Sequence, residues 1–87
     1  MKAWQKLEGV LRLADVPEPQ PAADQILLEV RAISLNRGEV RGVARAGEGV
    51  IPGWDVAGTV LAPAQLGSSP ARGTRVAAMV DGAGWAQ

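Results

Sequence analysis

Glycine and proline interrupt this chain so often that long regular elements are excluded. Eleven glycines and six prolines are spread over 87 residues, and both types end helices and strands, because the glycine backbone is too free and proline lacks a backbone N–H. In several of the pieces between them, apolar residues alternate with polar ones, which is typical of short β-strands. We therefore expect one mainly β domain, since a chain of this length forms a single small core.

Two strands are predicted at the N-terminus, over residues 1–5 and 10–15. Leu11 and Leu13 alternate with less apolar neighbours, and a glycine stands near the turn, so the two pieces should pair as an antiparallel hairpin. The segment 16–21 then has three prolines at alternate positions. This spacing predicts an extended surface loop, and the alternative is a proline-rich ligand motif.

The clearest strand is predicted over residues 25–35, where successive side chains should point to opposite faces of a sheet. One face is the more apolar and is the predicted core face. It carries Ile26, Leu28, Val30 and Ala32, whereas the other face carries Leu27, Glu29, Arg31 and Ile33.

A short helix is predicted after this strand, through about Ala44. Asn36 stands where an N-cap belongs, and Glu39 follows three residues later, which approximates a capping box. Gly38 and Gly42 weaken the helix, because glycine is a poor helix former.

Two further strands are predicted over residues 56–61 and 75–80, with Gly58 interrupting the first. Residues 63–73 form a loop. The glycines of 81–84 mark a turn and not a phosphate-binding loop, because neither the required further glycine nor a helix follows them.

The composition removes whole classes of chemistry. The chain has no Cys and no His, so disulfides, thiolate nucleophiles, imidazole bases and zinc sites that need His or Cys are excluded. Nine basic and nine acidic residues cancel without forming a basic cluster, which argues against nucleic acid as a partner. No signal peptide and no apolar run of about 20 residues is present, so we expect no membrane insertion and a cytoplasmic protein.

Several segments, in the right order, resemble one family, the medium-chain dehydrogenase/reductases, and in particular its quinone-reductase branch. Ser34-Leu35-Asn36-Arg37 is similar to the first active-site segment of that family, and Pro52-Gly53-Trp54-Asp55-Val56 begins a segment similar to the second. Abundant Ala and Gly, with more Arg than Lys, are also typical of bacterial proteins. The resembling segments are residues 1–3, 10–13, 16–19, 26–30, 34–37, 52–60, 73–77 and 82–86.

The resemblance implies a GroES-like fold, which is a strongly twisted, partly open β-barrel with one or two short helical turns. Residues 1–87 would be the N-terminal, substrate-binding and catalytic domain. Its cleft would face a C-terminal Rossmann domain that carries NADP(H) and that this chain lacks, so we expect a truncated chain that is inactive alone. The implied activity is reduction of quinones or α,β-unsaturated carbonyls by NADPH.

Zinc is not expected to take part. The zinc-dependent members of the family have Cys at the position matching Asn36 and His at the position matching Trp54, and this chain has neither ligand. Asp55 matches an acidic residue of those enzymes, but one carboxylate cannot replace three ligands. Gly38 stands where those members carry a hydroxyl residue for proton relay.

The resemblance implies roles for five side chains. Asn36 would approach the nicotinamide and the acceptor as the catalytic residue, with helix capping as the alternative. Arg37 would reach a cofactor phosphate or the domain interface, unless it is only a solvated cation, and Arg41 would contact a polar or acidic acceptor. Trp54 would form a flat wall for a quinone or fill the core, and Asp55 would orient its loop by accepting backbone hydrogen bonds.

Two other functions stay open. The chain could be a non-enzymatic GroES-like module that binds a partner or forms a homodimer, because a barrel without its second domain exposes apolar surface. It could also belong to an enoyl-reductase domain of a lipid or polyketide synthase. The start at Met1 and the direct entry into the first strand favour a free-standing enzyme.

Overall fold

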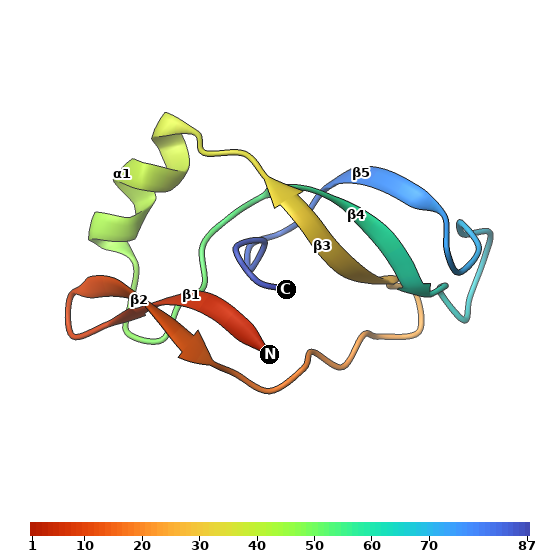
Figure 1. The fold of residues 1–87 in the computed structure, drawn as a ribbon, viewed down its shortest axis with the longest axis horizontal. Helices are drawn as coiled ribbons and strands as arrows, with labels where there is room; N and C mark the ends of the chain where they lie inside the picture. Colours follow the sequence, from red (N-terminus) through yellow and green to blue (C-terminus); the bar gives the residue numbers. More distant parts are fainter.

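Two separate antiparallel sheets and one helix make up the fold (Figure 1). The computed structural model describes residues 1–87. One sheet has two strands, β1 and β2, and the other has three, in the order β3-β4-β5. The chain is mainly β, as predicted, but the two sheets do not close into a barrel. The elements are β1 (Lys2–Leu7), β2 (Val10–Asp15), β3 (Leu27–Ile33), α1 (Arg37–Arg45), β4 (Asp55–Ala62) and β5 (Arg75–Met79).

The N-terminal hairpin forms as predicted, with β1 extending to Leu7. Glu8 and Gly9 link the strands with φ angles of 53° and 82°. Two successive positive φ values are the mark of a type I′ turn, whose twist suits a two-residue hairpin. The turn therefore fixes the register of the hairpin.

An ion pair closes the open end of the hairpin. Lys2 Nζ lies 2.8 Å from Asp15 Oδ1, and the hydrogen bond to Lys2, together with the Lys2 charge, lowers the pKa of the Asp15 carboxyl. The folded-state pKa lies below the unfolded one, so the pair stabilises the fold above the ordinary pKa of an aspartate. That stabilisation is lost as the pH falls through the lowered value.

A β-bulge at Arg31 changes which face of β3 is apolar. Val30 lies opposite Gly58 of β4, but the next paired residue is Ala32, opposite Ala57, so Arg31 has no partner. One extra residue moves all later side chains to the other face. The predicted core face is therefore right for Leu28 and Val30 but wrong for Ala32, whose place Ile33 takes opposite Val56.

The boundaries of three predicted strands also differ from the structure. β3 is shorter than the predicted 25–35, because Ser34 and the residues after it lead into the helix. β4 is one residue longer at each end than predicted, and β5 ends at Met79 and not at residue 80. The turn predicted at 81–84 is present, with positive φ at Gly82 and Ala83.

The core is small and centres on β4. Only eight of the 87 residues are buried, and the buried hydrophobic residues are Ala3, Val56, Val60 and Trp85. Along β4, every second residue from Val56 to Val60 is buried. Gly58 lies on this face, and position 58 needs glycine because any side chain there would collide with the backbone carbonyl of Glu29.

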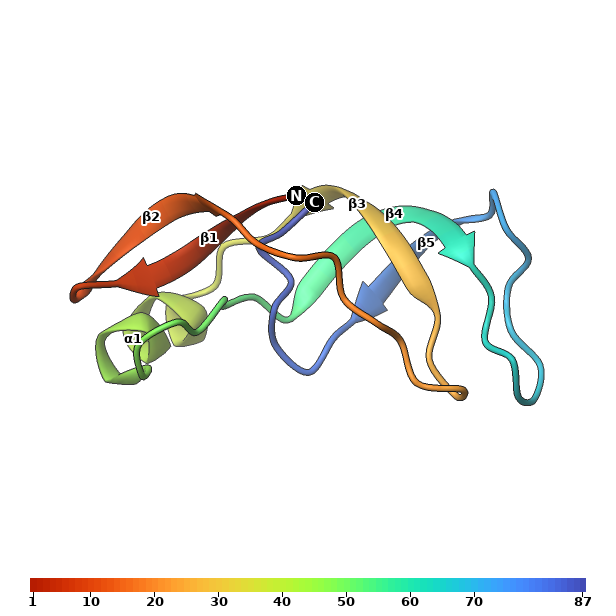
Figure 2. The same cartoon turned by 90° about the horizontal axis from the view of Figure 1, so that it is seen from below.

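Trp85 connects the two sheets. Its carbonyl accepts a hydrogen bond from Trp4 N (2.9 Å) in β1, and its own N–H donates to Pro52 O (2.9 Å) just before β4. The indole ring packs on Gly53, where any other residue would clash with it. Ala86 then forms a β-bridge with Ala3, which brings the two chain ends together (Figure 2).

Helix α1 lies beside the β1–β2 hairpin (Figure 2). Lys6 of β1 reaches the end of the helix, where its Nζ donates to the carbonyls of Val43 and Ala46, both at 2.8 Å. A cation at this end also meets the negative end of the helix dipole. No helix in this structure is long and apolar enough to cross a membrane.

The folded chain exposes more surface than its mass predicts. A folded monomer of 9.0 kDa is expected to expose roughly 4,900 Å², whereas this chain exposes 6005 Å². Several large apolar side chains contribute, among them Trp4, Leu13 and Ile33, which are 44%, 56% and 39% exposed. The excess, roughly 1,100 Å², exceeds the area that one partner buries in a standard protein interface.

The central packing role of Trp85 predicts different effects for two substitutions. The indole Nε1 is buried without a hydrogen-bond partner, so Trp85→Phe removes an unsatisfied donor and should change the free energy of unfolding by less than about 1.5 kcal/mol. Trp85→Ala leaves a cavity between the sheets and should cost about 3 to 5 kcal/mol. Denaturant unfolding of both variants measures this difference, and equal losses in both would contradict the packing role.

Candidate functional site

A polar cluster forms where β3 leads into α1 and where β4 begins, and Asn36 lies at its centre. The side-chain Nδ2 of Asn36 lies 3.1 Å from Ser34 Oγ, 2.6 Å from Glu39 Oε1 and 3.1 Å from Asp55 Oδ2. All three are acceptors toward this amide, so its donor side is fully occupied by the protein. Two of the predicted site residues, Asn36 and Asp55, are thus brought into direct contact.

Glu39 anchors the cluster from the first turn of α1. Only 2% of its surface is exposed, and its two oxygens accept from Asn36 N (3.1 Å) and from Trp54 N (3.0 Å). The predicted capping box of Asn36 and Glu39 is present. The contact with Trp54 was not predicted, because a capping pattern gives no information on residues distant in sequence.

Asp55 opens β4 and holds the end of β3. Its Oδ2 accepts from Ser34 Oγ at 3.1 Å as well as from Asn36 Nδ2. The Asp55 carboxylate thus accepts from the side chains of Ser34 and Asn36. The sequence had predicted that it would accept from backbone N–H groups. The backbone carbonyl of Asp55 also accepts from Ser34 N at 3.4 Å, so the loop is held from both sides.

Trp54 stands at the surface and does not fill the core. It is 37% exposed, and the edge of its six-membered ring lies over Gly38, where a Cβ would be only 2.6 Å from Cη2. A hydroxyl residue at position 38 would thus displace the ring. The Trp54 ring can lie in this position because Gly38 has no side chain.

Arg37 and Arg41 are exposed on α1, outside the hydrogen-bond network of the cluster. Together with Arg45 they follow each other at intervals of four residues, so the three guanidinium groups share one side of the helix. None of the three forms an ion pair. Arg37 and Arg41 are therefore free to meet an anionic group from solution.

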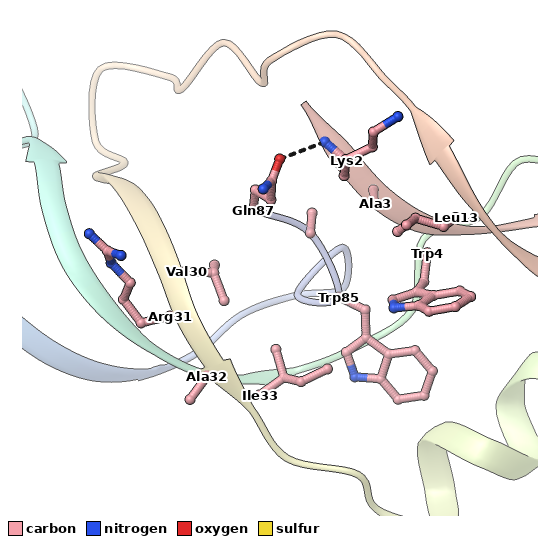
Figure 3. Close-up of a pocket in the computed structure, with 11 residues that line it drawn as sticks. Lys2, Ala3, Trp4, Leu13, Val30, Arg31, Ala32, Ile33, Trp85 and Gln87 are labelled. Carbon is pink, nitrogen blue, oxygen red and sulfur yellow. Dashed lines mark hydrogen bonds between the residues drawn. The ribbon is translucent and has the colours of Figure 1, made fainter.

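Two grooves open near the site. The smaller one, of about 230 Å³, is bordered by Ser34 and Asp55 of the cluster together with residues of β3 and β4. The larger one, of about 380 Å³, runs between β1 and β3 and contains none of the predicted site residues (Figure 3). Of the predicted site residues, only Asp55 borders the smaller groove.

The donor set of the cluster is poor in metal ligands. No group of three or more His, Cys, Asp and Glu side chains gathers in the structure. Glu39 and Asp55 are the two carboxylates of the cluster, and both already accept hydrogen bonds from the protein. The arrangement can position a loop and a flat aromatic wall.

No family model, no curated protein and no solved structure matches this chain.

The buried carboxylate of Glu39 predicts a large loss of stability when it is removed. Glu39→Ala leaves the N–H groups of Trp54 and Asn36 without an acceptor, at about 1 to 3 kcal/mol for each buried group. Glu39→Gln keeps one acceptor oxygen and should lose less. The exposed Glu18, which forms no ion pair, provides the control Glu18→Ala, expected within about 0.5 kcal/mol of wild type.

Thermal or urea unfolding of the three variants checks this order. A Glu39→Ala protein as stable as the Glu18→Ala control would show that the cluster contributes nothing to the fold.

Proposed function

We propose that this chain forms the acceptor-side domain of a cytoplasmic, NADPH-dependent and zinc-independent oxidoreductase with a GroES-like fold, which reduces quinones or α,β-unsaturated carbonyls. One observation carries the proposal. The two segments that resemble the active-site segments of the medium-chain dehydrogenase/reductases meet in space, with Asn36 Nδ2 3.1 Å from Asp55 Oδ2 and Glu39 Oε2 3.0 Å from Trp54 N. Segments that form one reaction site must meet in this way.

Bound NADPH supplies the hydride in such a reaction, and the protein supplies binding and orientation. The sequence contains no dinucleotide-binding fingerprint, so its residues fit only part of the cofactor. Arg37 is the group that suits this part, because an exposed guanidinium binds phosphate through two parallel hydrogen bonds. Most of the cofactor would lie on a second domain.

Trp54 is the residue best placed to meet the acceptor. The edge of its ring packs on Gly38 and the side chain is 37% exposed, so the exposed part of the indole can contact a planar quinone. The indole N–H has no hydrogen bond in the structure, since only the backbone N of Trp54 donates to the protein. That N–H can donate to an acceptor carbonyl.

Asn36 acts here as a positioning residue. Its amide nitrogen contacts Ser34, Glu39 and Asp55, and these contacts fix the start of α1 beside the start of β4. The position of Arg37 follows from this, because it is the next residue and opens the helix. Loss of Asn36 would therefore move Arg37 and Trp54 relative to each other.

Steady-state kinetics test the proposal. The 87-residue chain alone should not oxidise NADPH in the presence of a quinone, whereas a protein in which a nucleotide-binding domain follows this chain should. In that longer protein, Trp54→Ala should raise the KM for the quinone by about tenfold, in line with a lost aromatic contact of about 1 to 1.5 kcal/mol. Trp54→Phe should retain most of the affinity.

Arg45→Ala serves as the matched control for Arg41→Ala, since both residues are exposed arginines of α1. Only the change at Arg41 should alter the KM for the acceptor, because Arg41 is the arginine proposed to contact it. Turnover of NADPH by the 87-residue chain alone, or a longer protein that oxidises no NADPH, would overturn the proposal.

A non-enzymatic binding or oligomerisation module is the second candidate. The observation that favours it is the excess of exposed surface, 6005 Å² in total. Cofactor binding by the longer protein distinguishes the two candidates, because a module without activity needs no NADPH. An enoyl-reductase domain is a variant of the first candidate and differs in belonging to a lipid or polyketide synthase instead of a free-standing enzyme.

A further inference from the structure

The outer edge of β3 has no hydrogen-bonding partner. β3 is one of the two edge strands of its sheet, and apart from its ladder with β4, none of the backbone hydrogen bonds of the chain involves residues Leu27–Ile33. Such an edge presents a row of free N–H and C=O groups that can pair with another strand. The segment Arg31–Ile33 is also exposed to solvent.

An apolar groove of about 380 Å³ runs along this edge. Figure 3 shows Val30 and Ile33 on the β3 side of the groove, with Trp85 and Trp4 facing them across it. Ile33 and Trp4 remain 39% and 44% exposed. The free edge therefore borders an open space with apolar walls, and these walls lose contact with water if a strand enters.

The charges of β3 are complementary to a second β3 in antiparallel orientation. When two copies pair with Val30 opposite Val30, Glu29 of each strand lies opposite Arg31 of the other. Directly opposite side chains of opposite charge stabilise a strand pair. Within one chain, Arg31 has no partner on β4 and forms an ion pair with Glu29 of its own strand.

The exposed area is sufficient for such an interface. The chain exposes 6005 Å², which is roughly 1,100 Å² more than expected for its mass. A standard interface buries about 800 Å² on each partner. The net charge of zero also means that two copies do not repel each other as a whole.

We propose that two copies of this chain pair through β3 in antiparallel orientation, centred on Val30, to form a two-fold symmetric dimer. The two three-stranded sheets then form one six-stranded sheet across the interface. Symmetry makes each Glu29–Arg31 pair occur twice. This inference is independent of the proposed oxidoreductase activity, because it depends only on the edge, the groove and the charges of β3.

Charge reversal tests the proposal through a mixing experiment. Glu29→Arg places two positive charges on β3, and Arg31→Glu places two negative charges there, so each variant opposes like charges in its own dimer. Each should raise the dimer dissociation constant at least about tenfold. An equimolar mixture of the two variants should dimerise again, because each β3 then meets one of opposite charge. Sedimentation velocity from micromolar to millimolar chain concentration measures the monomer and dimer populations of the two variants and of their mixture.

Glu8→Arg is the matched control, since it changes the net charge by the same amount and removes an exposed ion pair, Arg12–Glu8, on the other sheet. This variant should dimerise like the wild type, and circular dichroism should show that every variant is folded. A wild-type chain that stays monomeric throughout this range would overturn the proposal. So would charge variants that dimerise as tightly as Glu8→Arg, or a mixture that remains monomeric.

Discussion

A carboxylate that is almost completely removed from water must be satisfied by protein donors, and the candidate site depends on how Glu39 meets this requirement. Its oxygens accept from the backbone N–H of Asn36 and from that of Trp54, which lies 15 residues away from Glu39 in sequence. No cation neutralises it, since none of the ion pairs includes Glu39. Hydrogen bonds without an ion pair therefore tie α1 to the start of β4, and removal of the carboxylate would leave the N–H groups that it binds unpaired.

This tie determines what the site can do. Because Asn36 and Asp55 are held against each other, they form a rigid support, and the groups left free for a ligand are the Trp54 ring and the guanidinium groups of Arg37 and Arg41. A support of this kind suits a reaction in which a bound cofactor supplies the chemistry and the protein supplies orientation. The same small core that allows this arrangement leaves the β3 edge and its groove uncovered.

The sequence predicted the local features well, because they depend on neighbouring residues. The hairpin, the helix beginning after Asn36 and the capping by Glu39 all follow from short patterns. The bulge at Arg31 could not be predicted, because an extra residue in an alternating strand leaves no mark in the pattern itself. The burial of Trp85 against Gly53, and the contact of Glu39 with Trp54, depend on segments that are distant in sequence.

Amide hydrogen exchange at Trp54 tests the central role of Glu39 most directly. If the buried carboxylate holds this N–H, the Trp54 amide should exchange as slowly as that of the buried Val60 in β4, which donates to Thr74 O just before β5, because both then open only when the whole domain unfolds. Exchange of the Trp54 amide at the rate of an exposed loop amide, while Val60 stays protected, would contradict the account.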